Sequence, residues 1–228
     1  MKLLIDVQCL RELDPHSGIE RYSMELSKAV ARNAGDHELW IATATETINT
    51  AEAIFGKWVP GKRILGLELP APVAENTPAS MARSRAAEYM REAFIAETTP
   101  DVVHLTSLVW DNAVTSIGAC ETSLKTTVTH YDLIPYLYPD RYLVAGWHRD
   151  WYWRKVHWLR NADLLLSISE YSKQEVTDTL GIREDRIAVV PGAAGSQFKP
   201  AQPNSDTEAL PETQVRHRPS ISALRQLQ

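Results

Sequence analysis

The 228-residue sequence contains only two cysteines, Cys9 and Cys120, which are far apart and form no C-x-x-C pair. That usage is typical of a reducing compartment and argues against a disulfide framework or a zinc site. No run of about 18 apolar residues occurs, and Asp6 ends the opening apolar run too early for a signal peptide. We therefore expect a soluble cytoplasmic protein with two buried thiols and no bound metal, in contact with the inner membrane at most peripherally.

An excess of positive charge is also absent. The chain has 24 lysines and arginines against 29 aspartates and glutamates, which gives a formal net charge of −5. This balance excludes the global basic field of a nucleic-acid binder or of a protein held to acidic lipid by charge alone. No G-x-G-x-x-G pattern follows the first apolar run, so a dinucleotide site is unsupported.

Short apolar runs alternate with amphipathic stretches along most of the chain. Strands are predicted over residues 2–8, 37–43, 63–69, 102–105, 164–168 and 187–190, with a central strand that starts at 126. Helices are predicted from Ser17, where Ser17 and Glu20 fit a capping box, and over 46–57, 80–97, 140–161 and 169–181. This alternation predicts an α/β fold with a doubly wound parallel sheet.

Periodicity also predicts which helix faces are buried. In the first helix the predicted apolar face is Ile19, Tyr22, Leu26 and Val30. In the 80–97 helix it is Met81, Ala86, Tyr89, Met90, Ala93 and Phe94. Trp147, Trp151 and Trp158 share a face of the next helix, and we interpret them as core rather than as a membrane or sugar surface.

The stretch after the central strand is the first candidate site. His130, Tyr131 and Asp132 follow that strand, and Pro135 and Pro139 are predicted to hold the following turn out of helix. Beyond the carboxyl ends of parallel strands the backbone opens toward a crevice. An imidazole, a phenol and a carboxylate there offer a group that titrates near neutrality, a hydroxyl and an acceptor. The alternative is that these residues only cap the strand and close a turn.

From Pro200 the composition changes. Proline, glutamine, asparagine, serine, threonine and glutamate dominate without apolar periodicity. We predict a domain over residues 1–199 and a disordered linker or tail over 200–228, with 203–219 mobile.

Three stretches together carry a resemblance to a known family. They are Ile5-Asp6 with Gly18-Ile19-Glu20-Arg21-Tyr22, then Tyr131-Asp132-Leu133-Ile134-Pro135, then Ala162-Asp163-Leu164 through Ser169-Glu170-Tyr171-Ser172 and Leu180-Gly181-Ile182 to Val189-Val190-Pro191-Gly192. Across about residues 1–199 their order and spacing resemble the amino-terminal half of GT-B glycosyltransferases of family 4, especially bacterial mannosyltransferase-like enzymes of O-antigen and polysaccharide assembly.

The resemblance implies roles for particular residues. Gly18 matches the loop that approaches the donor phosphates, where Glu20 replaces a glycine usual in the family. Tyr131 and Asp132 match the His-Asp pair near the donor sugar. His130 would take the His position only if the strand slipped by one residue, which would turn its side chain to the other face.

The remaining matches are weaker. Ser169 matches a serine near the crevice, and its alternative role is a plain N-cap. Arg21 and Lys173 lie near helix starts on the crevice side, and their alternative role is that of solvated surface cations.

The resemblance also implies a function. Family members carry a second Rossmann-like domain after the Val-Pro-Gly turn, with spaced glutamates and an Arg-Lys pair, and the sequence here continues into the polar tail. We expect a retaining, sugar-nucleotide-dependent hexosyltransferase, with GDP-mannose as the candidate donor and a saccharide or lipid-linked acceptor. It would need no further cofactor and would be inactive as an incomplete, truncated chain unless a second GT-B domain on another chain completes the site. The alternative is a non-catalytic domain that binds a saccharide or docks on a partner.

Overall fold

A computed structural model of the protein describes residues 1–193, apart from 12, 14–16, 71–79, 111–112 and 121–122. Its centre is a seven-stranded sheet with the order β3-β2-β1-β4-β5-β6-β7, in which every pair of neighbours is parallel. The strand order runs outward in both directions from β1 and β4, as in a doubly wound Rossmann-like sheet. The predicted fold class is confirmed.

The strands lie close to their predicted positions. They are β1 (Lys2–Asp6), β2 (Glu38–Ala44), β3 (Ile64–Leu67), β4 (Val102–Leu105), β5 (Thr126–His130), β6 (Leu164–Ser167) and β7 (Ile187–Val189). The α-helices are α1 (Gly18–Arg32), α2 (Ile48–Phe55), α3 (Ser80–Glu97), α4 (Ile134–Leu137), α5 (Pro139–Tyr142), α6 (Gly146–Trp158) and α7 (Glu170–Leu180).

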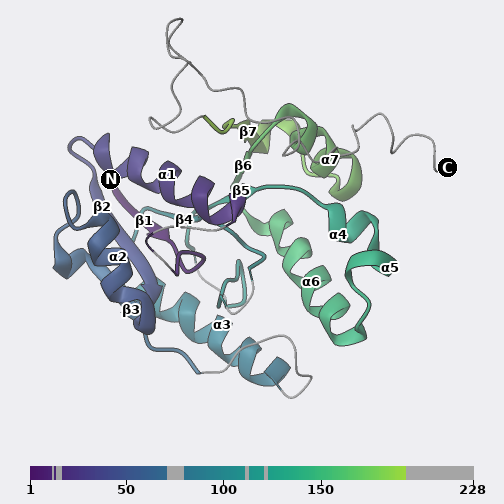
Figure 1. Ribbon diagram of the computed structural model, residues 1–228, viewed down its shortest axis with the longest axis horizontal. Helices are drawn as coiled ribbons and strands as arrows, with labels where there is room; N and C mark the ends of the chain where they lie inside the picture. The colour runs from purple at the N-terminus through teal and green to yellow at the C-terminus, as the bar shows by residue number, and fades with distance from the viewer. Residues whose placement is uncertain (12, 14–16, 71–79, 111–112, 121–122, 194–228) are drawn as a thin grey trace, which may run out of the picture. The chain divides into compact units, whose positions relative to one another are not determined.

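Both faces of the sheet are covered. Leu4 and Ile5 are successive residues of β1, and both are fully buried because they point to opposite faces. Ile5 belongs to a core shared with α1 and α2, whereas Leu4 belongs to a larger core shared with α3, α6 and α7. In Figure 1, β1 and β4 lie between α1 and α3. This burial explains why the strands read as continuous apolar runs.

The helix boundaries follow local chemistry. Ser17 accepts the backbone N–H of Glu20, and the Glu20 carboxylate accepts the backbone N–H of Ser17, which confirms the predicted capping box. At the carboxyl end of α7, Gly181 is the C-cap and has φ 66°, a left-handed conformation that glycine adopts without steric cost.

The prediction that Pro135 and Pro139 keep residues 131–139 out of helix is wrong. Each proline lies in the first turn of a single-turn helix, α4 and α5 respectively. Proline is tolerated there because the first N–H groups of a helix have no partner within it. The same segment divides the predicted 140–161 helix, because α5 ends at Tyr142 and α6 begins at Gly146.

The predicted apolar face of α3 is also wrong. Tyr89, Met90 and Phe94 are exposed by 57%, 47% and 39%, whereas Glu88, Arg91 and Glu92 are almost fully buried. The helix therefore turns Glu88, Arg91 and Glu92 toward the protein, while Arg83 and Arg85 are exposed. Buried charge is tolerated only when it is paired, and the contacts of this side supply the partners.

A network of buried charges joins α3 to β1 and α6. The Arg91 guanidinium donates to the Asp6 carboxylate, with 2.6 Å between Nε and Oδ2. Glu88 Oε1 lies 2.8 Å from Lys155 Nζ, and its other oxygen pairs with Arg154. Burial lowers the pKa of Lys155 to about 8, while the Glu88 charge acts in the opposite direction. The lysine therefore remains mostly protonated at neutral pH, and the ion pair holds α6 against α3.

Other packing predictions hold in part. The buried side of α1 is Ser23, Met24, Ser27 and Ala31, so the predicted face is only half-buried. In α6, Trp151 is buried and Trp158 partly buried, which confirms them as core, and Trp147 is outside the described side chains. Both cysteines are free thiols, but only Cys9 is buried, since Cys120 is partly exposed.

Chain contacts define one compact unit over Met1–Gly192. The predicted tail over 200–228, including the 203–219 stretch, lies outside the described residues. Among the helices that the structure describes, none is both long and apolar enough to cross a membrane.

Candidate functional site

The carboxyl ends of β1, β4, β5 and β6 are consecutive along one edge of the sheet. Residues that follow these strands therefore lie near one another although they are far apart in the sequence. The predicted site residues follow three of them, because Gly18, Glu20 and Arg21 come after β1, His130, Tyr131 and Asp132 at the end of β5, and Ser169 after β6.

Tyr131 connects this edge to α1. Its hydroxyl lies 2.8 Å from Ser23 Oγ and donates toward the backbone carbonyls of Thr106 and Ile19. Burial raises the pKa of the Tyr131 phenol well above its ordinary value, so the group stays protonated. A protonated hydroxyl occupied by these contacts positions α1 against β4 and β5. It is a poor candidate for proton transfer.

Ser169 is the N-cap of α7. Its Oγ accepts the backbone N–H of Ser172, and the Ser172 hydroxyl donates to the Tyr131 carbonyl at 2.7 Å. The structure thus brings the start of α7 against the end of β5. Ser169 is therefore an N-cap, as its alternative role requires.

The start of α1 carries both anion-binding and anion-repelling features. A helix amino terminus attracts negative charge, but here the Glu20 carboxylate already accepts the Ser17 N–H. A Cβ on Gly18 would meet no atom within 4 Å, so the surrounding protein does not itself require glycine there. The small residue leaves room for a ligand, and the carboxylate opposes an anionic one.

The two basic candidates differ in their surroundings. Arg21 is exposed on α1. Lys173 is partly buried on α7, and its Nζ lies 3.4 Å from the Glu184 carboxylate. Neither residue lines the cavity at this edge.

A cavity of about 220 Å³ opens beside the end of β5, on the side of α6. Ile19, His130 and Asp132 all line it, so the α1 start and the β5 end share one site. Asp132 is exposed, and its Oδ1 accepts the Ile134 N–H at 2.9 Å. The second oxygen of this carboxylate is available to accept a hydrogen bond from a hydroxyl of a bound molecule.

Register decides which way the β5 residues point. His130 pairs with Ser167, and its Nδ1 lies 3.3 Å from Ser167 Oγ. The Tyr131 hydroxyl reaches Ser23 on α1, and both His130 and Tyr131 line the cavity.

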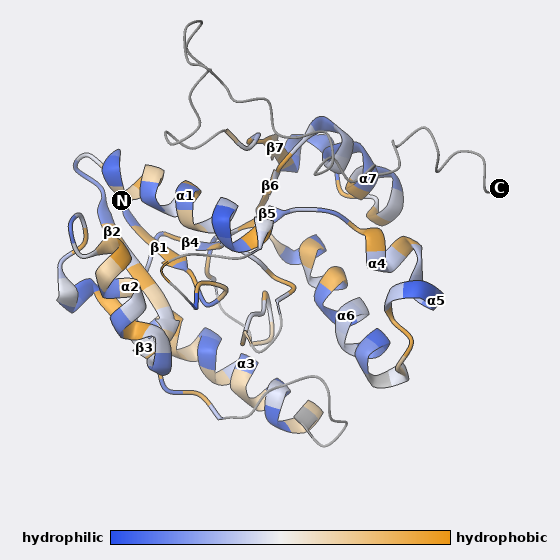
Figure 2. Ribbon diagram, in the orientation of Figure 1, coloured by the Kyte–Doolittle hydropathy of each residue, from blue (hydrophilic) through white to orange (hydrophobic). Residues whose placement is uncertain are grey.

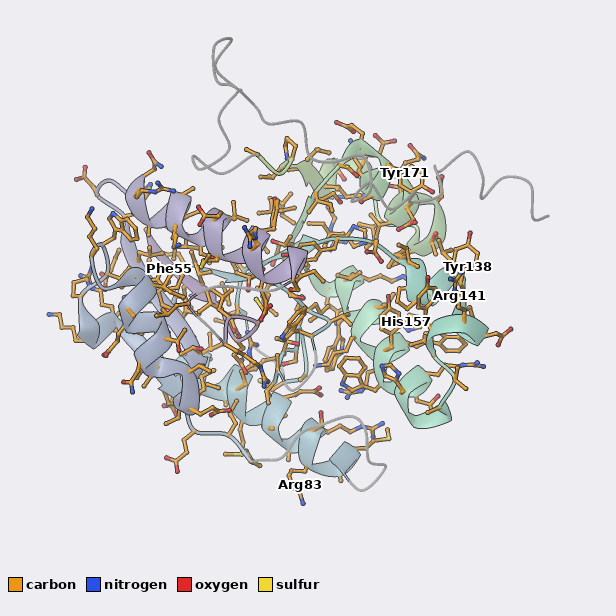
Figure 3. The ribbon with its side chains drawn as sticks, in the orientation of Figure 1. Phe55, Arg83, Tyr138, Arg141, His157 and Tyr171 are labelled. Carbon is orange, nitrogen blue, oxygen red and sulfur yellow. The ribbon has the colours of Figure 1, made fainter. Side chains whose placement is uncertain are left out.

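Sequence reasoning missed one wall of the cavity. Tyr152, Val156 and Leu159 line it from α6 and the turn that follows, and Ser107 and Leu108 line it from the β4 loop. The pattern at Tyr152 to Leu159 predicts burial but not the identity of the neighbour. The exposed side chains of α4 and α5 lie close to the cavity. In Figure 3, Tyr138 and Arg141 lie on the outer side of this pair of helices.

A metal site is not indicated by this part of the chain. Among the described residues, no group of three or more histidines, cysteines, aspartates or glutamates is placed to hold an ion.

A family model and curated relatives both show a similarity of this chain to glycosyltransferases. Residues 16–194 match the family model described as Glycosyltransferase Family 4. The chain is also 30% identical over 205 residues to a serotype-specific mannosyltransferase WbdA of Escherichia coli, and a second protein of that name matches at 30% over 180 residues. These alignments cover 87% and 76% of this chain but only 24% and 22% of the relatives, so the chain spans about a quarter of their length.

A solved structure has the same fold. The UDP-GlcNAc 2-epimerase of Methanocaldococcus jannaschii matches with a TM-score of 0.51 and 18% identity, over 83% of this chain and 45% of that one. At this identity the likeness concerns the arrangement of the sheet and helices.

Proposed function

Because the chain belongs to glycosyltransferase family 4 and has the fold of an amino-terminal GT-B domain, we propose that it forms the acceptor side of a retaining mannosyltransferase. The donor is GDP-mannose, and the acceptor is a growing saccharide or a lipid-linked one. The observation that carries the proposal is the family match over residues 16–194, which ends just beyond the last strand of the sheet.

The cavity beside β5 supports an acceptor rather than a donor site. Its lining contains the Asp132 carboxylate but no lysine or arginine, so a diphosphate would find no counter-charge there. The proposal therefore assigns the diphosphate to the second Rossmann-like domain that family members carry. Asp132 orients a sugar hydroxyl by accepting its hydrogen bond.

Exposed apolar residues beside this site support lipid-linked acceptors and peripheral contact with a membrane. Ile134, Leu137 and Tyr138 come shortly after Asp132 in the sequence and are exposed by 42%, 42% and 61%. α4 is largely orange, the hydrophobic colour, in Figure 2. Tyrosine and aliphatic side chains at a surface suit the boundary between water and lipid.

Calorimetric titration tests whether this chain alone binds the sugar-nucleotide donor tightly. A two-domain enzyme with micromolar affinity for its donor has a binding free energy of about −8 kcal/mol, and half of that leaves roughly millimolar affinity. We expect the 228-residue chain alone to bind GDP-mannose and UDP-sugars only at that level and to show no appreciable transfer. Micromolar binding of GDP-mannose by this chain would contradict the proposal.

Glu20 offers a more local test. Glu20→Gly is expected to remove the capping contact and cost about 1 kcal/mol of folding stability. Removing the negative charge from the α1 amino terminus should tighten GDP-mannose binding by up to about fivefold. Glu20→Gln is the matched control, since it removes the charge but keeps a side chain that can accept the Ser17 N–H. If neither variant changes the affinity, the donor phosphates do not approach α1.

A further inference from the structure

The outer side of α3 leaves a row of apolar side chains in water. Tyr89, Met90 and Phe94 are exposed by 57%, 47% and 39%, and Ala86 is exposed as well. These residues are three or four positions apart, so they are neighbours along one side of the helix. Single apolar residues are ordinary on a protein surface, whereas a continuous row of them is typical of a contact with another molecule.

Charged residues of opposite sign lie at the two ends of this row. Arg83 is exposed near the amino end of α3, and Glu97 is exposed at its carboxyl end. Each of them is seven residues from Met90, which corresponds to about two helical turns, so all three lie on the same side of the helix. In Figure 3, Arg83 points away from the body of the protein.

The row is therefore complementary to itself when two copies of α3 pack antiparallel with Met90 at the midpoint. Residues at equal distances before and after Met90 then face each other. Arg83 faces Glu97 of the second copy, and the same pair forms again on the other side of the midpoint. Ala86 faces Phe94 of the second copy, so a small side chain meets a large one, as close packing of helices requires.

Other arrangements of the same row lack this match. Parallel packing would place Arg83 against Arg83 and Glu97 against Glu97, which is unfavourable for both pairs. An anionic lipid surface would attract the arginine end of the row and repel the glutamate end. The distribution of charge thus favours a second copy in the antiparallel direction.

We propose that the outer side of α3 is an interface between two copies of this chain, related by a two-fold axis that passes Met90. A two-fold interface brings the same patch of both subunits together, and so it needs the self-complementarity that this row has. A single helix pair buries less than the standard interface of about 1,600 Å², so the dimer is reversible, with a dissociation constant on the order of tens of micromolar.

Analytical ultracentrifugation of the 228-residue chain tests this assignment. Between about 1 and 500 µM we expect the average mass to rise from the monomer value of 25.6 kDa toward twice that value. Met90→Glu places two carboxylates next to each other at the two-fold axis and should weaken the association at least about tenfold. Its melting temperature should be unchanged at low concentration, because the Met90 side chain is half-exposed in the monomer.

Charge reversal tests the direction of packing. Arg83→Glu alone, or Glu97→Arg alone, creates two like-charged pairs per dimer and should weaken the association about fivefold to tenfold. The double variant reverses both members of each pair and should restore it. Arg85→Glu is the matched control, since Arg85 is also exposed but lies two positions from Arg83 and so on a different side of α3. It should leave the association unchanged.

A wild-type chain that stays monomeric up to about 500 µM would overturn the inference. So would a dimer that Met90→Glu leaves intact, or one that the double charge reversal does not restore. Flotation with vesicles of phosphatidylglycerol checks the alternative occupant. Binding of the monomer to these vesicles that is lost in Met90→Glu, without self-association in solution, would assign the row to a lipid surface instead.

Discussion

Replacing Glu88 by alanine is expected to destabilise the protein by about 3–5 kcal/mol. Glu88 is 1% exposed and pairs with Lys155, which is fully buried, and with Arg154. The substitution leaves the Lys155 ammonium buried without its counter-ion, which costs far more than the loss of a surface pair. Urea denaturation followed by circular dichroism measures the change.

Tyr89→Ala on the next position of α3 is the matched control. Tyr89 is 57% exposed, so its removal should change stability by no more than about 0.5 kcal/mol. The double variant Glu88→Leu with Lys155→Met removes both charges and should be more stable than the sum of the two single losses predicts. If Tyr89→Ala is the more damaging substitution, the orientation of α3 is wrong.

Acid is expected to destabilise the fold strongly between pH 6.5 and 4. Burial lowers the pKa values of His104 and His130 from 6.5 to about 4. Within this window the unfolded chain binds protons that the folded chain does not, so stability falls as the pH falls. Each histidine contributes a loss of up to about 3 kcal/mol, which is complete near pH 4 and absent above pH 6.5. Denaturation curves at a series of pH values measure it.

Carboxylates also titrate near the lower end of this window, so the comparison with a variant isolates the histidines. His130→Leu removes one titrating ring and should reduce the loss between pH 6.5 and 4 by up to about 3 kcal/mol. An identical pH dependence in wild type and variant would show that the His130 ring accepts a proton in the folded state as readily as in the unfolded state.

The bounds of α3 were predictable from the sequence, but its orientation was not. A pattern of charged and apolar residues indicates a helix and two faces, and burial is normally assigned to the apolar one. Here Glu88 and Arg91 find partners on α6 and β1, which are distant in the sequence. Such ion pairs depend on residues that become neighbours only in the folded protein. The sequence of the helix alone therefore does not indicate them.

The candidate site, like α3, was only partly predictable from the sequence. The position of Asp132 beyond β5 follows from the rule for parallel sheets, because a strand run and the polar residues after it are visible in the sequence. The α6 wall with Tyr152 and Val156 is not visible, since it depends on how α6 packs across β5. The lack of a hydrogen-bond partner for Nε2 of His130 among the described residues likewise depends on which side chains surround it.

Mannosyl transfer with an Asp132 variant is the most direct test of the proposed acceptor-side role of this chain. The chain is incubated with GDP-mannose and a mannose oligosaccharide, either alone or with the donor-binding part of a related mannosyltransferase, and products are analysed by mass spectrometry. We expect addition of a hexose only when the donor-binding part is present, with a rate about 10 to 100 times lower for Asp132→Asn, as expected for loss of a hydrogen bond to a charged group. Transfer that is equally fast with Asp132→Asn, or absent with the wild-type chain in both arms, would contradict it.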